Sequence, residues 1–160
     1  MLVQTMNPEK VFNEIENDWD ILSDNLIDRL SKSYHTERMK LKINKLDTYP
    51  KAYSVKSKNK NTWIFILSKA PSKRIYKGTD SVNICCLIYY YHELGIRVFK
   101  KIPQGDWSVY NAHVFTRYNE RLELNIDSTL DKVISFFTEN GYILVQIIKK
   151  EGASQLCVGK

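Results

Sequence analysis

One histidine and two arginines recur at every fourth position in the segment from 113 to 121, as His113, Arg117 and Arg121. On an α-helix this spacing places one imidazole and two guanidinium groups on the same face. Arginine binds phosphate through paired N–H donors, and histidine exchanges a proton near neutral pH. The pattern therefore predicts a phosphodiester site, with His113 as general acid or base and Arg117 and Arg121 holding phosphate.

A non-catalytic interpretation of this stripe stays open. Glu120 lies three residues after Arg117 and directly before Arg121, so the stripe also fits a solvated helix face that carries ion pairs. Metal binding is disfavoured, because Asp106 and Glu120 are the nearby acids and two arginines repel a cation. We therefore predict no metal ligands and no cofactor.

Two short helices are expected to carry and flank the stripe. Asn111 is placed to begin a helix over about 112–122, and Ser128 followed by Asp131 predicts the start of a second helix over about 129–139. Asn140 and Gly141 are typical residues for the end of that helix.

The segment His113–Phe137 resembles small bacterial toxin domains related to BrnT, which belong to the broad RelE-like group of RNA-cleaving toxins. The resemblance rests on the His-x-x-x-Arg-x-x-x-Arg pattern on a short helix, followed by a second capped helix. It implies a curved antiparallel sheet with helices and a basic surface facing RNA. It also implies that the stripe holds or cleaves RNA, and that an acidic protein such as an antitoxin is a partner.

Charge is distributed unevenly along the 160 residues, which carry a formal net charge of +6. Residues 1–33 hold seven acids and three bases, residues 34–121 hold six acids and seventeen bases, and residues 122–160 hold five acids and four bases. Clustered positive charge attracts polyanions. We therefore expect one positive face, adjoining the helix of His113, that binds RNA or another polyanion.

Basic and aromatic residues of the middle segment are the candidates for nucleic-acid binding. Lysines and an arginine in turns would contact phosphates, and exposed aromatic rings would stack on bases. Tyr89 and Tyr91 lie in an apolar run and are expected in the core. The candidate binding residues are Lys56, Lys58, Lys60, Lys73, Arg74, Lys77, Trp107 and Tyr110.

The first segment predicts one amphipathic helix over 8–33. Asn7 precedes Pro8 as a good N-cap, and apolar residues follow at spacings of three and four from Val11 to Leu30. The acids between them are expected on a solvated face, with docking onto the basic middle of the chain or onto a partner as the alternative.

The β-rich middle, over 38–110, predicts an antiparallel meander of five or six strands. The expected strands are 39–46, 52–56, 62–67, 82–91, 96–102 and 107–110. Residues 142–158 predict a last strand or hairpin. The whole chain is thus expected to form a single α+β domain over 1–160.

Composition narrows the class of protein further. The three cysteines show no C-x-x-C spacing, and Cys85 and Cys86 sit in an apolar run, so we expect inert thiols in a reducing cytoplasm. The sequence has no apolar run long enough to cross a membrane, and a natural extension beyond Lys160 is one expectation.

The first hypothesis is an RNA-directed domain acting as a metal-independent endoribonuclease. The alternative is a non-catalytic nucleic-acid- or protein-binding module of phage or mobile-element origin.

Overall fold

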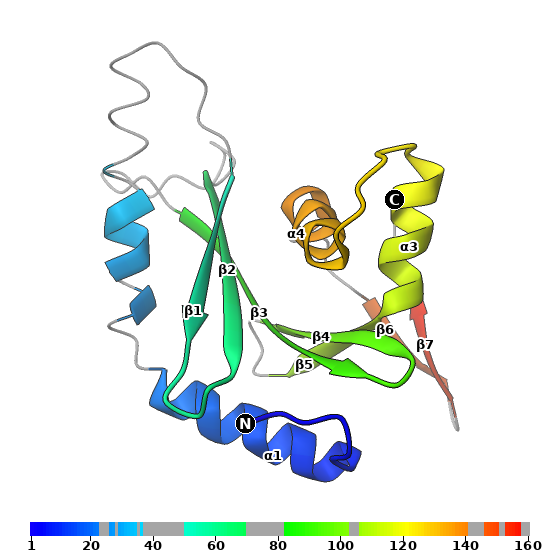
Figure 1. The fold of residues 1–160 in the computed structure, drawn as a ribbon, viewed down its shortest axis with the longest axis horizontal. Coiled ribbons are helices and arrows are strands. Elements are labelled where there is room, and N and C mark those ends of the chain that lie inside the picture. Colours follow the sequence, from blue (N-terminus) through cyan, green and yellow to red (C-terminus); the bar gives the residue numbers. More distant parts are fainter. Residues whose placement is uncertain are drawn as a thin grey trace.

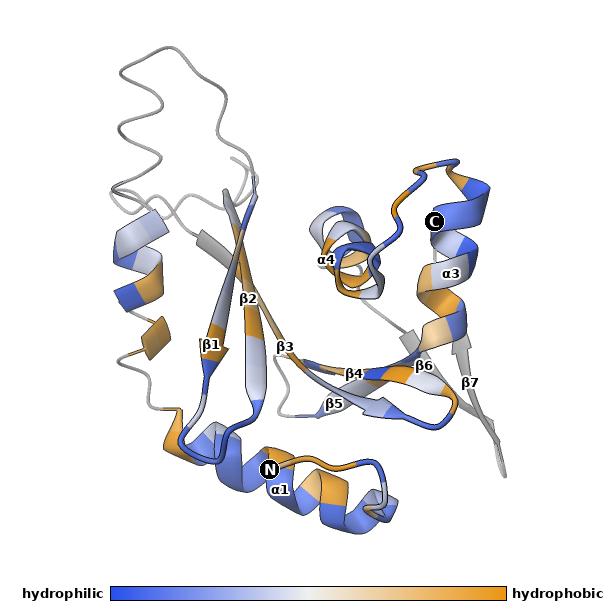
Figure 2. Cartoon of the chain, viewed as in Figure 1, coloured by the Kyte–Doolittle hydropathy of each residue, from blue (hydrophilic) through white to orange (hydrophobic). Residues whose placement is uncertain are grey.

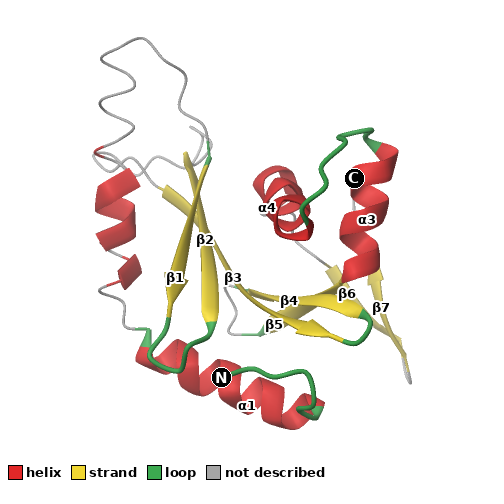
Figure 3. Cartoon of the chain, viewed as in Figure 1, coloured by secondary structure: helices red, strands yellow, loops and turns green. Residues whose placement is uncertain are grey.

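A computed structural model gives the α+β architecture shown in Figure 1. It describes residues 1–22, 26–27, 29–34, 36, 50–69, 82–102, 106–140, 146–150 and 153–157. An N-terminal helix is followed by five strands, two helices and a terminal hairpin, which confirms the expected fold class (Figure 3). The elements are α1 (Pro8–Ile21), β1 (Lys51–Lys56), β2 (Thr62–Lys69), β3 (Val82–His92), β4 (Gly95–Lys101), β5 (Trp107–Asn111), α3 (Ala112–Arg121), α4 (Thr129–Asn140), β6 (Gln146–Lys150) and β7 (Ala153–Cys157).

Strands β1 to β5 form one antiparallel sheet in sequence order, so β3 lies at its centre. Because β3 has neighbours on both edges and packing on both faces, its run of apolar residues is buried almost continuously from Cys85 to Ile88. The expected strand at 39–46 lies outside the described residues. Strands β6 and β7 pair with each other as a separate antiparallel hairpin.

The two faces of the sheet carry separate hydrophobic cores. The side facing α1 packs Val11 and Ile15 against strand residues such as Trp63 and Phe65. The opposite side packs Phe115 of α3 and residues of α4 against the sheet (Figure 1). Alternation along β3 sends Cys86 to the first core and Cys85 to the second, as period-two geometry requires.

Helix α1 begins as expected and ends earlier than expected. The Asn7 side chain accepts a hydrogen bond of 2.9 Å from the backbone N–H of Lys10, and Pro8 occupies the first helical position. The backbone leaves the helix at Leu22, where ψ is 77°, and helical residues return at 26–27 and 29–34. The prediction of one helix over 8–33 is therefore wrong in its extent. The sequence continues after Leu22 with Ser, Asp and Asn, residue types with a low preference for helix interiors.

The caps of the two later helices differ. Ser128 Oγ accepts a hydrogen bond of 3.3 Å from the Asp131 N–H, which confirms the predicted start of α4. Asn111 occupies the N-cap of α3 without a capping bond from its side chain, and it also ends β5 opposite Arg97. No helix within the described ranges is both long and apolar enough to cross a membrane.

Candidate nucleic-acid interface

The predicted stripe on α3 is exposed along its length. His113, Arg117 and Arg121 share one face of the helix, as their spacing of four predicts, and all three are exposed. Arg117 Nη1 donates to Glu120 Oε2 at 3.2 Å, and both side chains are more than half exposed. The segment 112–140, which holds α3 and α4, carries five acids against three bases. The stripe is therefore partly neutralised within its own helix and lies in a segment of net negative charge.

A second basic cluster lies at the turn between β1 and β2. Lys56, Lys58 and Lys60, called here the lysine turn, are exposed and form no ion pair with any acid in the described part of the chain. The whole hairpin, residues 51–69, contains five lysines and no acid. Figure 2 shows this turn as hydrophilic. The predicted contacts Lys73, Arg74 and Lys77 lie outside the described residues.

Backbone hydrogen bonds set the shape of the lysine turn. The Ser57 N–H donates to the Asn61 carbonyl at 2.9 Å, and the Lys60 N–H donates to the Ser57 carbonyl at 3.0 Å. Lys60 has a φ of 62°, in the left-handed region, which lets the chain reverse within few residues. The Asn61 N–H also donates to Ser57 Oγ at 3.2 Å. The turn is thus closed by bonds at both of its ends.

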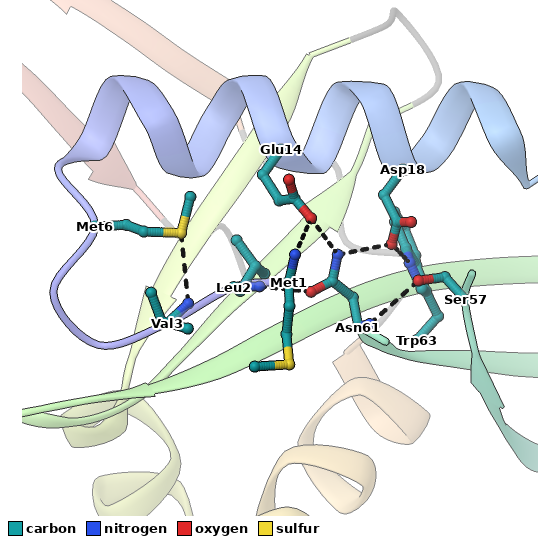
Figure 4. Close-up of polar contacts among 9 residues, drawn as sticks. All are labelled: Met1, Leu2, Val3, Met6, Glu14, Asp18, Ser57, Asn61 and Trp63. Carbon is teal, nitrogen blue, oxygen red and sulfur yellow. Dashed lines mark hydrogen bonds and ion pairs between the residues drawn. The ribbon is translucent and has the colours of Figure 1, made fainter. Parts of the chain in front are cut away.

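A buried polar network ties the lysine turn to α1 (Figure 4). Asn61 Nδ2 donates to Asp18 Oδ2 at 3.0 Å and to Glu14 Oε1 at 3.1 Å, while its Oδ1 accepts from the Leu2 N–H at 2.6 Å. Trp63 Nε1 donates to the same Asp18 oxygen at 2.7 Å. Asp18 and Trp63 are fully buried and Asn61 nearly so. Because a buried polar group is costly without partners, this network holds the turn in one place.

The acids of α1 correct the expectation of a fully solvated acidic face. Asp18 is fully buried, Glu14 pairs with the Met1 ammonium at 2.5 Å, and Glu16 Oε1 lies 3.7 Å from Lys101 Nζ. The helix has therefore docked onto the chain itself, which is the alternative interpretation. Glu9 and Asp20 keep exposed positions.

The aromatic residues expected to be exposed are enclosed by other side chains. Tyr110 is 5% exposed, and its ring meets Phe137 edge-on at 4.9 Å between centroids. Trp107 packs against Trp19 and Trp63, donates from Nε1 to Glu16, and has Lys101 Nζ 4.5 Å from its ring. Tyr110 is too buried to stack on a base, which corrects the prediction for this ring, whereas Trp107 is half-buried and its role stays a prediction. The cause is tertiary, because helices from both ends of the chain cover these strand residues.

Tyr91 is exposed, although its place in an apolar run predicts a position in the core. It is 57% exposed, with Tyr89 half-buried beside it. The last pair between β2 and β3 is Trp63 with Ile88, so the end of β3 pairs only with β4. The sequence signal was its position two residues before the turn at Glu93 and Leu94.

The expected single positive face does not form from the described residues. In Figure 1 the β1–β2 turn lies beside α1, while α3 lies at the other end of the sheet with α4. The lysine turn and the α3 stripe are therefore two separate basic regions.

The chain matches no family model, no curated protein and no solved structure. The resemblance to RelE-like toxins thus stays a prediction from the sequence.

Proposed function

We propose that the protein binds RNA in the cytoplasm through the lysine turn, as a non-catalytic module. The observation that supports this most directly is the exposure of Lys56, Lys58 and Lys60 on a hairpin that has no acid. Three ammonium groups without ion-pair partners among the described residues attract the phosphates of a polyanion and release its counterions. The free, buried thiols of Cys85 and Cys86 suit a reducing compartment.

The mode of binding follows from the chemistry of the turn. Lysine contacts phosphate as a flexible point charge, and phosphate contacts carry no sequence information. The bonds from Asn61 to Asp18 and Leu2 keep the backbone of the turn fixed, so only the lysine side chains must become ordered on binding. We therefore expect binding that depends strongly on salt and weakly on sequence.

The test measures RNA affinity against salt concentration for wild type and for the triple variant K56Q/K58Q/K60Q. Wild type should bind, and the variant should lose about two units of the slope of log K against log salt, about 0.7 for each lost phosphate contact on a single strand. The matched control K10Q/K32Q/K132Q removes the same charge from other described positions. An equal loss in the control, or wild-type binding unaffected by salt, would contradict the proposal.

A second candidate, metal-independent RNA cleavage, draws on the exposure of His113, Arg117 and Arg121 along one face of α3. In that reaction a ribose 2′-OH attacks the adjacent phosphate and the P–O5′ bond breaks, which leaves a 2′,3′-cyclic phosphate and a 5′-hydroxyl. His113 takes the proton from the 2′-OH or gives one to the leaving 5′-oxygen, with water as the other proton partner, and the arginines neutralise the developing charge. Incubation of labelled RNA with wild type and H113A in EDTA tests it. Cleavage by wild type alone would support it, whereas no cleavage or equal cleavage by H113A would exclude it.

A further inference from the structure

Two tyrosines form an aromatic pair at the end of β3, beyond the last residue paired with β2. Their rings meet edge-on with centroids 6.0 Å apart. Tyr89 packs against the core under α3 and α4, and Tyr91 extends from it with 57% of its surface exposed. Tyr89 therefore packs against one edge of the Tyr91 ring and leaves more than half of Tyr91 exposed to solvent.

A row of side chains connects this pair with the lysine turn. Lys56 lies directly opposite Thr62 in the β1–β2 register, so both project from the same face of the sheet. Tyr89 directly follows Ile88, which pairs with Trp63, so the antiparallel register brings Tyr89 beside Thr62 on that same face. The row thus runs across three strands, from an exposed ammonium group through a hydroxyl to the tyrosine pair.

We propose that this row binds a single-stranded segment of RNA, with one base stacked on Tyr91 and the neighbouring phosphates directed toward the lysine turn. The inference rests on the proposed RNA-binding function and specifies its substrate class. A single strand presents unpaired bases that can stack on an aromatic ring, whereas a duplex keeps its bases paired and inaccessible. Positive charge at one end of the row and an exposed ring at the other match the two parts of a nucleotide.

Charges around the row determine which way the phosphates lie. Burial, and secondarily the neighbouring Tyr91, raise the pKa of Tyr89 above its ordinary value, so its phenol stays neutral and does not repel phosphate at physiological pH. Glu93 is exposed in the turn after Tyr91 and does repel phosphate. The sugar–phosphate backbone of the bound RNA is therefore directed away from the β3–β4 turn and toward Lys56.

The experiment compares an unstructured single-stranded RNA with the duplex of the same sequence, by fluorescence anisotropy at fixed salt. The variant Y91A should bind the single strand about tenfold more weakly, as expected for loss of one stacked base, and should bind the duplex unchanged. Y91F keeps the ring and should bind like wild type. L94A is the matched control, because Leu94 is an exposed apolar residue of the same hairpin, 81% exposed. A urea midpoint for each variant confirms an intact fold.

The outcomes separate this inference from the proposed function. If Y91A binds the single strand like wild type while K56Q/K58Q/K60Q loses affinity, the stacking inference is overturned and RNA binding by the lysine turn stands. Equal losses for Y91A and L94A, or a loss by Y91A on the duplex as well, also overturn it. If wild type binds neither RNA in a salt-dependent manner, both proposals fail.

Discussion

The lysine turn and the α3 stripe look equivalent as lists of basic residues, but they differ in what surrounds them. Arg117 of the stripe pairs with Glu120, and the segment 112–140 that holds α3 and α4 carries five acids against three bases. The lysine turn belongs to a hairpin without acids, and the acids of neighbouring α1 that contact it are used in bonds to Asn61. Local basicity is thus a poor guide to surface potential until the fold shows which acids lie nearby.

The two regions are also attached to the sheet by different forces. The α3 stripe sits on a helix held by an apolar anchor, Phe115, which is 1% exposed. The lysine turn is held by directional hydrogen bonds in which Asn61 donates to Glu14 and Asp18 and accepts from the Leu2 N–H. This contrast predicts which substitutions destabilise each region and how strongly.

The largest effect is expected for the anchor of α3. F115A removes a ring that contacts Tyr110 and the phenylalanines of α4, and should lower the free energy of unfolding by about 4 kcal/mol. Urea denaturation measures it, with V114A as a control on an exposed neighbour. A loss below about 1 kcal/mol would contradict the view that apolar packing holds the α3 stripe.

A smaller loss is expected for the polar anchor of the lysine turn. D18A leaves the Trp63 and Asn61 donors without their shared acceptor in a buried site, and should cost about 3 kcal/mol. The exposed D20A is the matched control and should change stability by less than about 0.5 kcal/mol. Equal stability of the two variants would show that the polar network does not hold the lysine turn in place.

Stability at high pH tests the burial of the central strand β3, which contributes one cysteine to each of the two cores. Burial raises the pKa of Cys85 to about 11 and that of Cys86 to about 12, so both thiols stay protonated in the folded state while the unfolded chain loses these protons near pH 9. The unfolded state then binds fewer protons, and stability should fall as pH rises above about 9, by an amount on the order of 1 kcal/mol per pH unit for each thiol. Urea midpoints at about pH 8 and about pH 10 measure the fall. The variant C85A/C86A should show a shallower decrease, and an unchanged slope would contradict this origin.

The smallest effect is expected for the ion pair on α3. A double-mutant cycle of R117A and E120A should give a coupling of only about 0.3 kcal/mol, because both side chains are exposed and screened. The coupling should decrease in high salt. A value above about 1 kcal/mol would show that the pair stabilises α3 and is more than a partial neutralisation of the stripe.

Local patterns in the sequence were sufficient to predict most of the elements. The cap at Asn7 and Pro8, the Ser128 cap, the buried run of β3 and the turn before Gly95 all depend on neighbours within a few residues. Such short-range preferences survive in almost any tertiary setting. The same holds for the opposite orientations of Cys85 and Cys86, because the alternation of a strand is a property of its backbone.

Only the tertiary structure decided which polar and aromatic groups are buried. Asp18 lies three residues after Ile15, on the face of α1 that meets the sheet, whereas the exposed Asp20 lies on another face. The burial of the Asp18 carboxylate depends on Trp63 and Asn61, more than forty residues away, which supply its donors. Tyr110 is covered by α4, whereas Tyr91 is open because β2 ends before reaching it. Side-chain type and spacing specify what a residue is able to contact. Whether it is buried depends on which distant segment packs against it, and that packing forms only when the sheet and its helices come together.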